Sequence, residues 1–96
     1  MELMILKHEQ RYNRSKDIAN KLKEESLELQ NALKFNDHDS IVDEALDVIT
    51  VCLNAINEQS KVGVDIEFAI SQHQKKLLDR GWETEKCVKF TMCEPK

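Results

Sequence analysis

Four acidic residues stand where two amphipathic helices should be apolar, and no other feature of the chain constrains its fold as much. They are Glu25, Glu28, Glu44 and Asp47. Hydrophobic residues recur with helical spacing over residues 16–33 and 41–56, and each segment carries one of these acids inside its apolar stripe and another at the border. Because a carboxylate buried without a partner costs several kcal/mol, a core that holds four of them needs compensating positive charge. A divalent cation is the simplest partner that would satisfy all four.

The rest of the composition favours an all-α fold. The 96 residues include two glycines and one proline, at position 95, so the turn residues that sheets and sandwiches need are missing. The apolar arc of residues 41–56 covers more than half of the helix circumference, which three helices of one chain can hardly cover. We therefore expect a single all-α domain, an antiparallel helical bundle completed by oligomerisation as a homodimer or homotetramer.

Local signals place the ends of the first two helices. Ser15 is a plausible N-cap for the first, which should stop near Asn36. Ser40, with Asp43 three residues later, resembles a capping box that opens the second helix, and Gly63 is a natural residue to end it. The short connectors predict that adjacent helices are antiparallel.

A third helix is expected over Ile66–Arg80, capped by Asp65 and terminated by Gly81. The resulting parts are an N-terminal segment that forms a short helix or an arm (1–14), a helical core (about 15–80) and an extended C-terminal tail (82–96).

Charge and composition exclude several classes of function. The formal net charge of −4 leaves no basic stripe for a nucleic acid, and no apolar run approaches the length of a membrane-spanning helix. The three cysteines, Cys52, Cys87 and Cys93, lack the paired spacing of a zinc site. We expect free thiols in a reducing cytoplasm, with Cys52 as a small core residue. The expected protein is cytoplasmic and binds neither nucleic acid nor a membrane.

The spacing of the four acids predicts a metal site. Residues three apart on a helix share a face, so each helix presents two carboxylates, and two antiparallel helices would bring both pairs into one cluster. Such hard oxygen ligands suit Mg²⁺ or Mn²⁺. The alternative is a set of buried acids held by Lys or Arg. Glu24, Asp43 and Glu58 lie outside the apolar arcs and fit an ordinary surface.

The same residues resemble a known family. Glu-Glu-x-x-Glu at 24–28, a gap of fifteen residues and Glu-x-x-Asp at 44–47 are similar to the signature of the all-α nucleoside triphosphate pyrophosphatases. This family includes MazG, the dimeric dUTPases and phosphoribosyl-ATP pyrophosphohydrolase, and the resemblance covers about residues 16–80. It implies that the four acids bind Mg²⁺, that Glu24 holds a second metal ion or orients the attacking water, and that the chain cleaves (d)NTP to (d)NMP and pyrophosphate in nucleotide-pool control. Glu24 and Glu28 are the candidate catalytic residues.

Further candidates for substrate binding come from helical geometry. His73, Lys76 and Arg80 share one side of the third helix, and a cationic strip beside the metal cluster would neutralise a triphosphate. A solvated helix edge is the alternative. The strip has Lys76-Leu77 where MazG-like proteins often carry Lys-Asn. Asn54 lies on the same side of its helix as Asp47 and could touch the substrate or make an interhelical hydrogen bond.

Two other functions stay open. One is a non-catalytic helical dimerisation or regulatory module with vestigial carboxylates, in which basic side chains would fill the acidic cluster. The other is phosphoribosyl-ATP pyrophosphohydrolase. Phe35, Phe68 and Trp82 are the aromatic residues that could stack on a base, and each suits packing better than a pocket.

Overall fold

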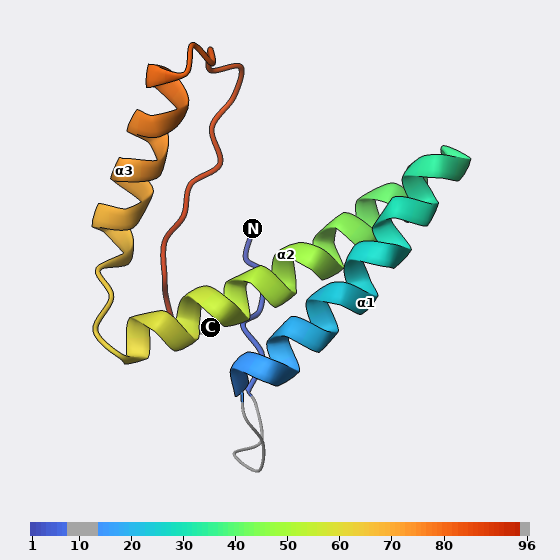
Figure 1. Ribbon diagram of the computed structural model, residues 1–96, viewed down its shortest axis with the longest axis horizontal. Coiled ribbons are helices and arrows are strands. Elements are labelled where there is room, and N and C mark those ends of the chain that lie inside the picture. Colours follow the sequence, from blue (N-terminus) through green and yellow to red (C-terminus); the bar gives the residue numbers. More distant parts are fainter. Residues whose placement is uncertain (8–13, 95–96) are drawn as a thin grey trace.

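The computed structural model describes residues 1–7 and 14–94, and the regular structure within them is entirely helical. Its helices are α1 (Arg14–Phe35), α2 (His38–Lys61) and α3 (Ile66–Asp79). Helices α1 and α2 lie side by side and antiparallel, whereas α3 leaves the end of α2 at a steep angle (Figure 1). The expected all-α fold is confirmed. None of the described helices is long and apolar enough to span a membrane.

All three helices end in the same way. Each is followed by a residue with positive φ, which is Asn36, Gly63 or Gly81. The N–H of the next residue donates to a carbonyl in the last turn of the helix, as from Asp37 to Ala32 at 3.3 Å. Asn36 has φ 53°. Asparagine tolerates this conformation, so the chain reverses within two residues. The predicted ends near Asn36, Gly63 and Gly81 are confirmed.

The helix starts agree less well with the sequence signals. Asp37, not Ser40, caps α2, and its carboxylate accepts hydrogen bonds from the Ser40 backbone N–H at 3.3 Å and from Oγ at 3.0 Å. Since α1 already begins at Arg14, the predicted cap Ser15 lies within its first turn. The predicted cap of α3 is confirmed, because Asp65 accepts a hydrogen bond from the Phe68 N–H at 3.0 Å.

Packing is concentrated between α1 and α2. Among the described residues, the buried hydrophobic side chains are Ala32 and Val51. Cys52 is exposed, so its predicted place in the core is wrong. Its neighbour Val51 takes the position between the helices, because one residue along α2 turns the side chain by about 100°.

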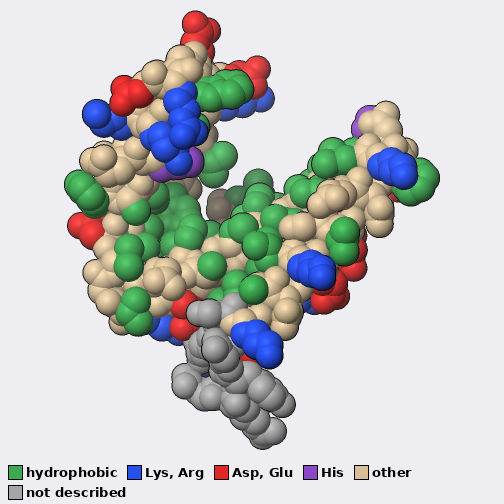
Figure 2. All heavy atoms as spheres, in the orientation of Figure 1, with side chains coloured by type: hydrophobic (Ala, Val, Ile, Leu, Met, Phe, Trp, Pro, Cys, Tyr) green, Lys and Arg blue, Asp and Glu red, His purple; other side chains and the backbone are tan. Residues whose placement is uncertain are grey.

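Helix α3 has no buried residue and packs on neither α1 nor α2 to a comparable extent. The expectation that it lies antiparallel against α2 is therefore wrong. Gly63, with φ 96°, and the extended Asp65 direct the chain away from the hairpin before α3 begins. Hydrophobic side chains line the inside of the angle between α3 and the hairpin (Figure 2).

The two ends of the chain differ in their contacts. Residues 1–7 have no regular secondary structure, and the Leu6 N–H donates to Asn54 Oδ1 at 3.3 Å, so this part is an arm on α2. Residues 8–13 of the expected arm lie outside the described residues. From Trp82 to Glu94 the chain contains neither helix nor strand and runs back beside α3 toward α2 (Figure 1).

Candidate functional site

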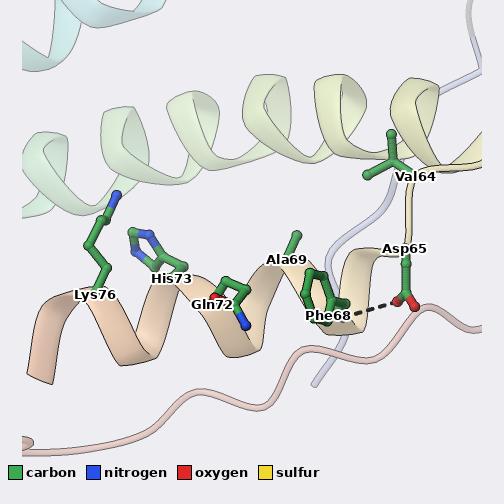
Figure 3. Close-up of a pocket in the computed structure, with 7 residues that line it drawn as sticks. All are labelled: Val64, Asp65, Phe68, Ala69, Gln72, His73 and Lys76. Carbon is green, nitrogen blue, oxygen red and sulfur yellow. Dashed lines mark hydrogen bonds between the residues drawn. The ribbon is translucent and has the colours of Figure 1, made fainter. Parts of the chain in front are cut away.

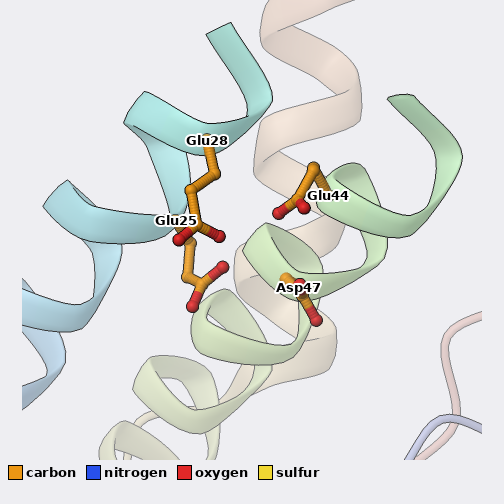
Figure 4. Close-up of side chains that lie close together, drawn as sticks. All are labelled: Glu25, Glu28, Glu44 and Asp47. Carbon is orange, nitrogen blue, oxygen red and sulfur yellow. The ribbon is translucent and has the colours of Figure 1, made fainter. Parts of the chain in front are cut away.

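The four acids singled out in the sequence form one cluster between α1 and α2. Glu25, Glu28, Glu44 and Asp47 each offer a carboxylate oxygen, and these oxygens all lie within 4.8 Å of one another. The first two come from α1 and the other two from α2, and the carboxyl groups of Glu28 and Glu44 point toward each other (Figure 4). This spacing is short enough for one small cation to contact several of them.

The tight reversal at Asn36 and Asp37 explains why the pairs meet. Glu28 and Glu44 each stand about two helical turns from it, and Glu25 and Asp47 about three turns. In an antiparallel hairpin, residues at matching distances from the turn lie opposite each other. The register of the cluster is therefore set by the helix ends.

Two oxygens of the cluster are buried without a partner. Glu25 retains 7% of its exposure, less than most hydrophobic residues of the hairpin, and Glu44 is half-buried. Glu25 Oε2 and Glu44 Oε2 accept no hydrogen bond. A buried carboxylate oxygen in this state is costly unless a cation or a proton meets it. Such a donor set fits a hard divalent cation.

Glu28 displays the electrostatic effect of this crowding. A hydrogen bond to Glu44, followed by the negative charge of Glu25, raises the pKa of Glu28 from 4.5 to about 7. The shift arises because several carboxylates share a small space, and adding a proton removes one negative charge. A divalent cation would relieve the same repulsion.

One lysine reaches the cluster from outside. Lys21 Nζ lies 3.1 Å from Glu25 Oε1 and 3.4 Å from Glu24 Oε1. The hydrogen bond to Glu25 and the charge of Glu24 raise the pKa of Lys21 above 10.5. Sequence reasoning missed this residue, although its spacing of three and four residues from the two acids is a readable helical signal.

Glu24 and Asn54 stand apart from the four acids. The Glu24 side chain is 58% exposed and belongs to the outer surface of α1, where it pairs with Lys21. Asn54 uses its Oδ1 to hold the Leu6 backbone of the N-terminal arm. Of the two roles considered for Asn54, the structure records a hydrogen bond within the protein, but to the arm rather than to another helix.

The cationic strip of α3 is not beside the cluster within one chain. His73 and Lys76 line an open hollow of about 480 Å³ on α3 and the segment before it, and they project from the same side of the helix (Figure 3). Arg80 is the C-cap of α3. Among the described residues, neither Lys76 nor Arg80 pairs with an acid, while Lys75 pairs with Asp79 at 3.6 Å.

A second hollow adjoins the cluster directly. It measures about 320 Å³ and is bounded by Glu28 and Glu44 on the side of the four acids. Its other lining residues are Asn31, Ala32, Phe35, Asp37 and Ser40. Phe35 is 77% exposed, so its ring is available to a ligand. Sequence reasoning did not identify Asn31, because a polar residue on a helix carries no signal without the turn that closes this hollow.

Comparison with known proteins identifies one family. A family model described as the MazG nucleotide pyrophosphohydrolase domain matches residues 13–82, which contain the four acids and all three helices. Searches of curated proteins and of solved structures found no match.

Proposed function

The chain belongs to the MazG nucleotide pyrophosphohydrolase family, and we propose that it is a Mg²⁺-dependent enzyme that cleaves a (deoxy)nucleoside triphosphate to the monophosphate and pyrophosphate. One observation carries the proposal: four carboxylates converge within 4.8 Å. Two of their buried oxygens lack a partner, which supports a cation site over a structural ion-pair network. The proposed role is control of the nucleotide pool, in the cytoplasm.

The four acids of the cluster would hold the metal ion, with Mn²⁺ as a substitute for Mg²⁺. Bound there, the metal would polarise the phosphates and lower the pKa of a coordinated water. Carboxylates supply the hard oxygen ligands that both ions prefer.

Glu28 and Glu24 are the proposed catalytic carboxylates. Glu28 is exposed at the mouth of the cluster, so it can face both the metal and solvent and accept a proton from the attacking water. Glu24 lies on the outer surface of α1, next to Glu25, and is proposed to orient that water or to hold a second metal ion.

The substrate would lie across the hollow beside the cluster. Asn31 and Phe35 could contact the nucleoside, since this hollow shares Glu28 and Glu44 with the metal site. His73, Lys76 and Arg80 are proposed to neutralise the phosphates, and Asn54 to support the site through the arm. Because α3 stands apart from the cluster in one chain, we propose a homodimer or homotetramer in which α3 meets the cluster of a neighbouring copy.

A non-catalytic module would need basic side chains to fill the cluster. Lys21 contacts one oxygen of Glu25, while Glu25 Oε2 and Glu44 Oε2 stay unpartnered. This arrangement supports the enzymatic function.

The test is pyrophosphate release from a panel of ribo- and deoxynucleoside triphosphates, with phosphoribosyl-ATP included. The wild-type protein should release pyrophosphate from at least one of them in Mg²⁺ or Mn²⁺, and EDTA should stop the reaction. Release from phosphoribosyl-ATP alone would identify the chain as a phosphoribosyl-ATP pyrophosphohydrolase. No release from any substrate, with a folded protein, would overturn the enzymatic proposal.

A further inference from the structure

Among the described residues, Lys21 is the basic residue that forms an ion pair with the acidic cluster. It lies one helical turn before Glu25 on α1, and its ammonium group bridges Glu25 at 3.1 Å and Glu24 at 3.4 Å. The lysine side chain is 55% exposed, whereas that of Glu25 is 9% exposed. Lys21 therefore brings a positive charge from solvent to the most buried acid of the cluster.

The contact neutralises charge without filling the cluster. Lys21 binds Glu25 Oε1 and leaves Glu25 Oε2 without a partner. Glu44 Oε2, on the other helix, also has no partner. Among the described ion pairs, this is the one that reaches any of the four acids. Two unpartnered carboxylate oxygens among the four acids thus coexist with a nearby positive charge.

We propose that Lys21 is a built-in counter-charge of the acidic cluster, which stabilises the hairpin without metal and weakens the affinity of the cluster for free divalent cations. This inference rests on the proposed function, since it assumes a metal site among the four acids. Its physical basis is that an ammonium group and a divalent cation compete electrostatically for the same carboxylates. Glu24, on the outer surface, offers the ammonium group a second partner when a cation draws on Glu25.

A lowered affinity for free metal has a functional consequence. A nucleoside triphosphate adds several negative charges to the site, which outweigh one lysine. Lys21 would thereby favour loading of metal together with the triphosphate over loading of metal alone.

The experiment compares Mn²⁺ binding to the wild-type protein, Lys21→Met, Lys21→Arg and Lys23→Met. Met keeps most of the apolar length of lysine without the charge, and Arg keeps the charge. Lys23 is a matched control because it lies on α1, is exposed and points to a different side from Lys21. Mn²⁺ binding is followed by electron paramagnetic resonance of the free ion, and thermal unfolding is measured in EDTA.

Lys21→Met should bind Mn²⁺ about tenfold more tightly than the wild type, because one positive charge next to the site is removed. In EDTA its melting temperature should fall by about 2–4 °C, since Glu25 loses its partner. Lys21→Arg should restore both values, and Lys23→Met should match the wild type.

The outcomes separate this inference from the proposed function. If the wild type binds Mn²⁺ but Lys21→Met binds it equally or more weakly, the counter-charge role is overturned and the metal site stands. If the wild type and all variants fail to bind Mn²⁺ with or without a triphosphate, the metal site itself is overturned, and this inference with it.

Discussion

The α1–α2 hairpin and α3 carry their charged residues in opposite ways. Among the described residues, all that are buried, Glu25 included, belong to the hairpin, and α3 has none. The acids of the hairpin converge between two helices, whereas His73, Lys76 and Arg80 lie on an exposed helix. The hairpin thus assembles its cluster within one chain, and α3 presents cations that no described part of the same chain covers.

Buried charge in the hairpin and solvated charge on α3 have different energetic costs. In the hairpin, burial of charge is a cost that the fold tolerates at this position, which points to a chemical role for the acids. On α3 the charges are solvated and cost little, so their position alone indicates no role. Changes in the hairpin should therefore alter chemistry in every assembly state, and changes in α3 should act through assembly.

The largest expected effect is that of Glu44→Gln. The substitution keeps the side-chain size but removes a charge from the cluster, so pyrophosphate release should fall by about three orders of magnitude. Folding should not suffer in the absence of metal, because repulsion among the four acids decreases and Glu44 has no basic partner in the described structure. Pyrophosphate release and thermal unfolding are measured on the same preparation.

Asp43→Asn is the matched control for Glu44→Gln, because Asp43 is the neighbouring acid on α2 and is exposed. It should leave release unchanged. A folded Glu44→Gln protein with full activity would contradict the assigned site. Destabilisation by about 3–5 kcal/mol would instead indicate that Glu44 is the structural partner of a buried Lys or Arg side chain.

The sequence also predicts the α1–α2 hairpin better than it predicts the placement of α3. The acid cluster was predictable because the spacing within each helix and a two-residue reversal at Asn36 fix the register of both pairs. The cap at Asp37 was missed because Ser40 and Asp43 have the spacing of a capping box, and this pattern suggested a start three residues later. In the structure Ser40 instead donates its hydrogen bonds to Asp37. The direction of α3 was not predictable from helix periodicity, since the backbone angles at Gly63 and Asp65 decide it.

Some side-chain environments also lay beyond the sequence. Cys52 faces solvent although it falls on the apolar arc of α2, because that arc is wider than the contact with α1. Asn54 lies on the same side of α2 as Asp47, but its Oδ1 accepts a hydrogen bond from the Leu6 N–H of the N-terminal arm. Both cases depend on how much of a helix is covered, which periodicity does not state.

The second prediction tests whether another copy covers α3. Phe68 is 61% exposed and lines the hollow on this helix. If a second copy packs there, the wild type should sediment as an oligomer at micromolar concentration. The dissociation constant of the Phe68→Glu oligomer should be at least tenfold higher, because burying an unpaired charge is costly. Sedimentation velocity over a concentration series measures both.

Gln74→Glu is the control for that experiment, since Gln74 is exposed on α3 and lies outside the hollow. It adds the same charge and should leave the oligomer intact. A compact wild-type monomer at micromolar concentration would contradict the assembly and, with it, the proposed place of α3 in the site.

A smaller effect is expected from Lys76→Met. Loss of one cation near the phosphates should lower kcat/KM about tenfold without changing the affinity for free Mn²⁺, because Lys76 is proposed to contact the phosphates and none of the described ion pairs joins it to the four acids. Lys75→Met is the control, since Lys75 pairs with Asp79 along the helix. Equal activity in both variants would assign the α3 cations to a solvated surface.

The smallest expected effect is a pH dependence of stability in the hairpin. The pKa of Glu28 is about 7 in the folded protein, against 4.5 as its ordinary value. The folded state therefore holds this proton more tightly than the unfolded state, and the associated stability is fully present below pH 4.5 and lost as the pH rises through 7. In EDTA, the urea midpoint should fall between pH 5.5 and pH 8.

Glu28→Gln separates this contribution from every other titrating group. The variant keeps a neutral side chain at all pH values, so its urea midpoint should fall less than that of the wild type over the same interval. Saturating Mg²⁺ should also flatten the wild-type curve at the alkaline end, because a bound cation replaces the proton as the partner of the cluster. A wild-type midpoint that rises from pH 5.5 to pH 8 in EDTA would contradict the crowding of Glu28 against Glu25 and Glu44.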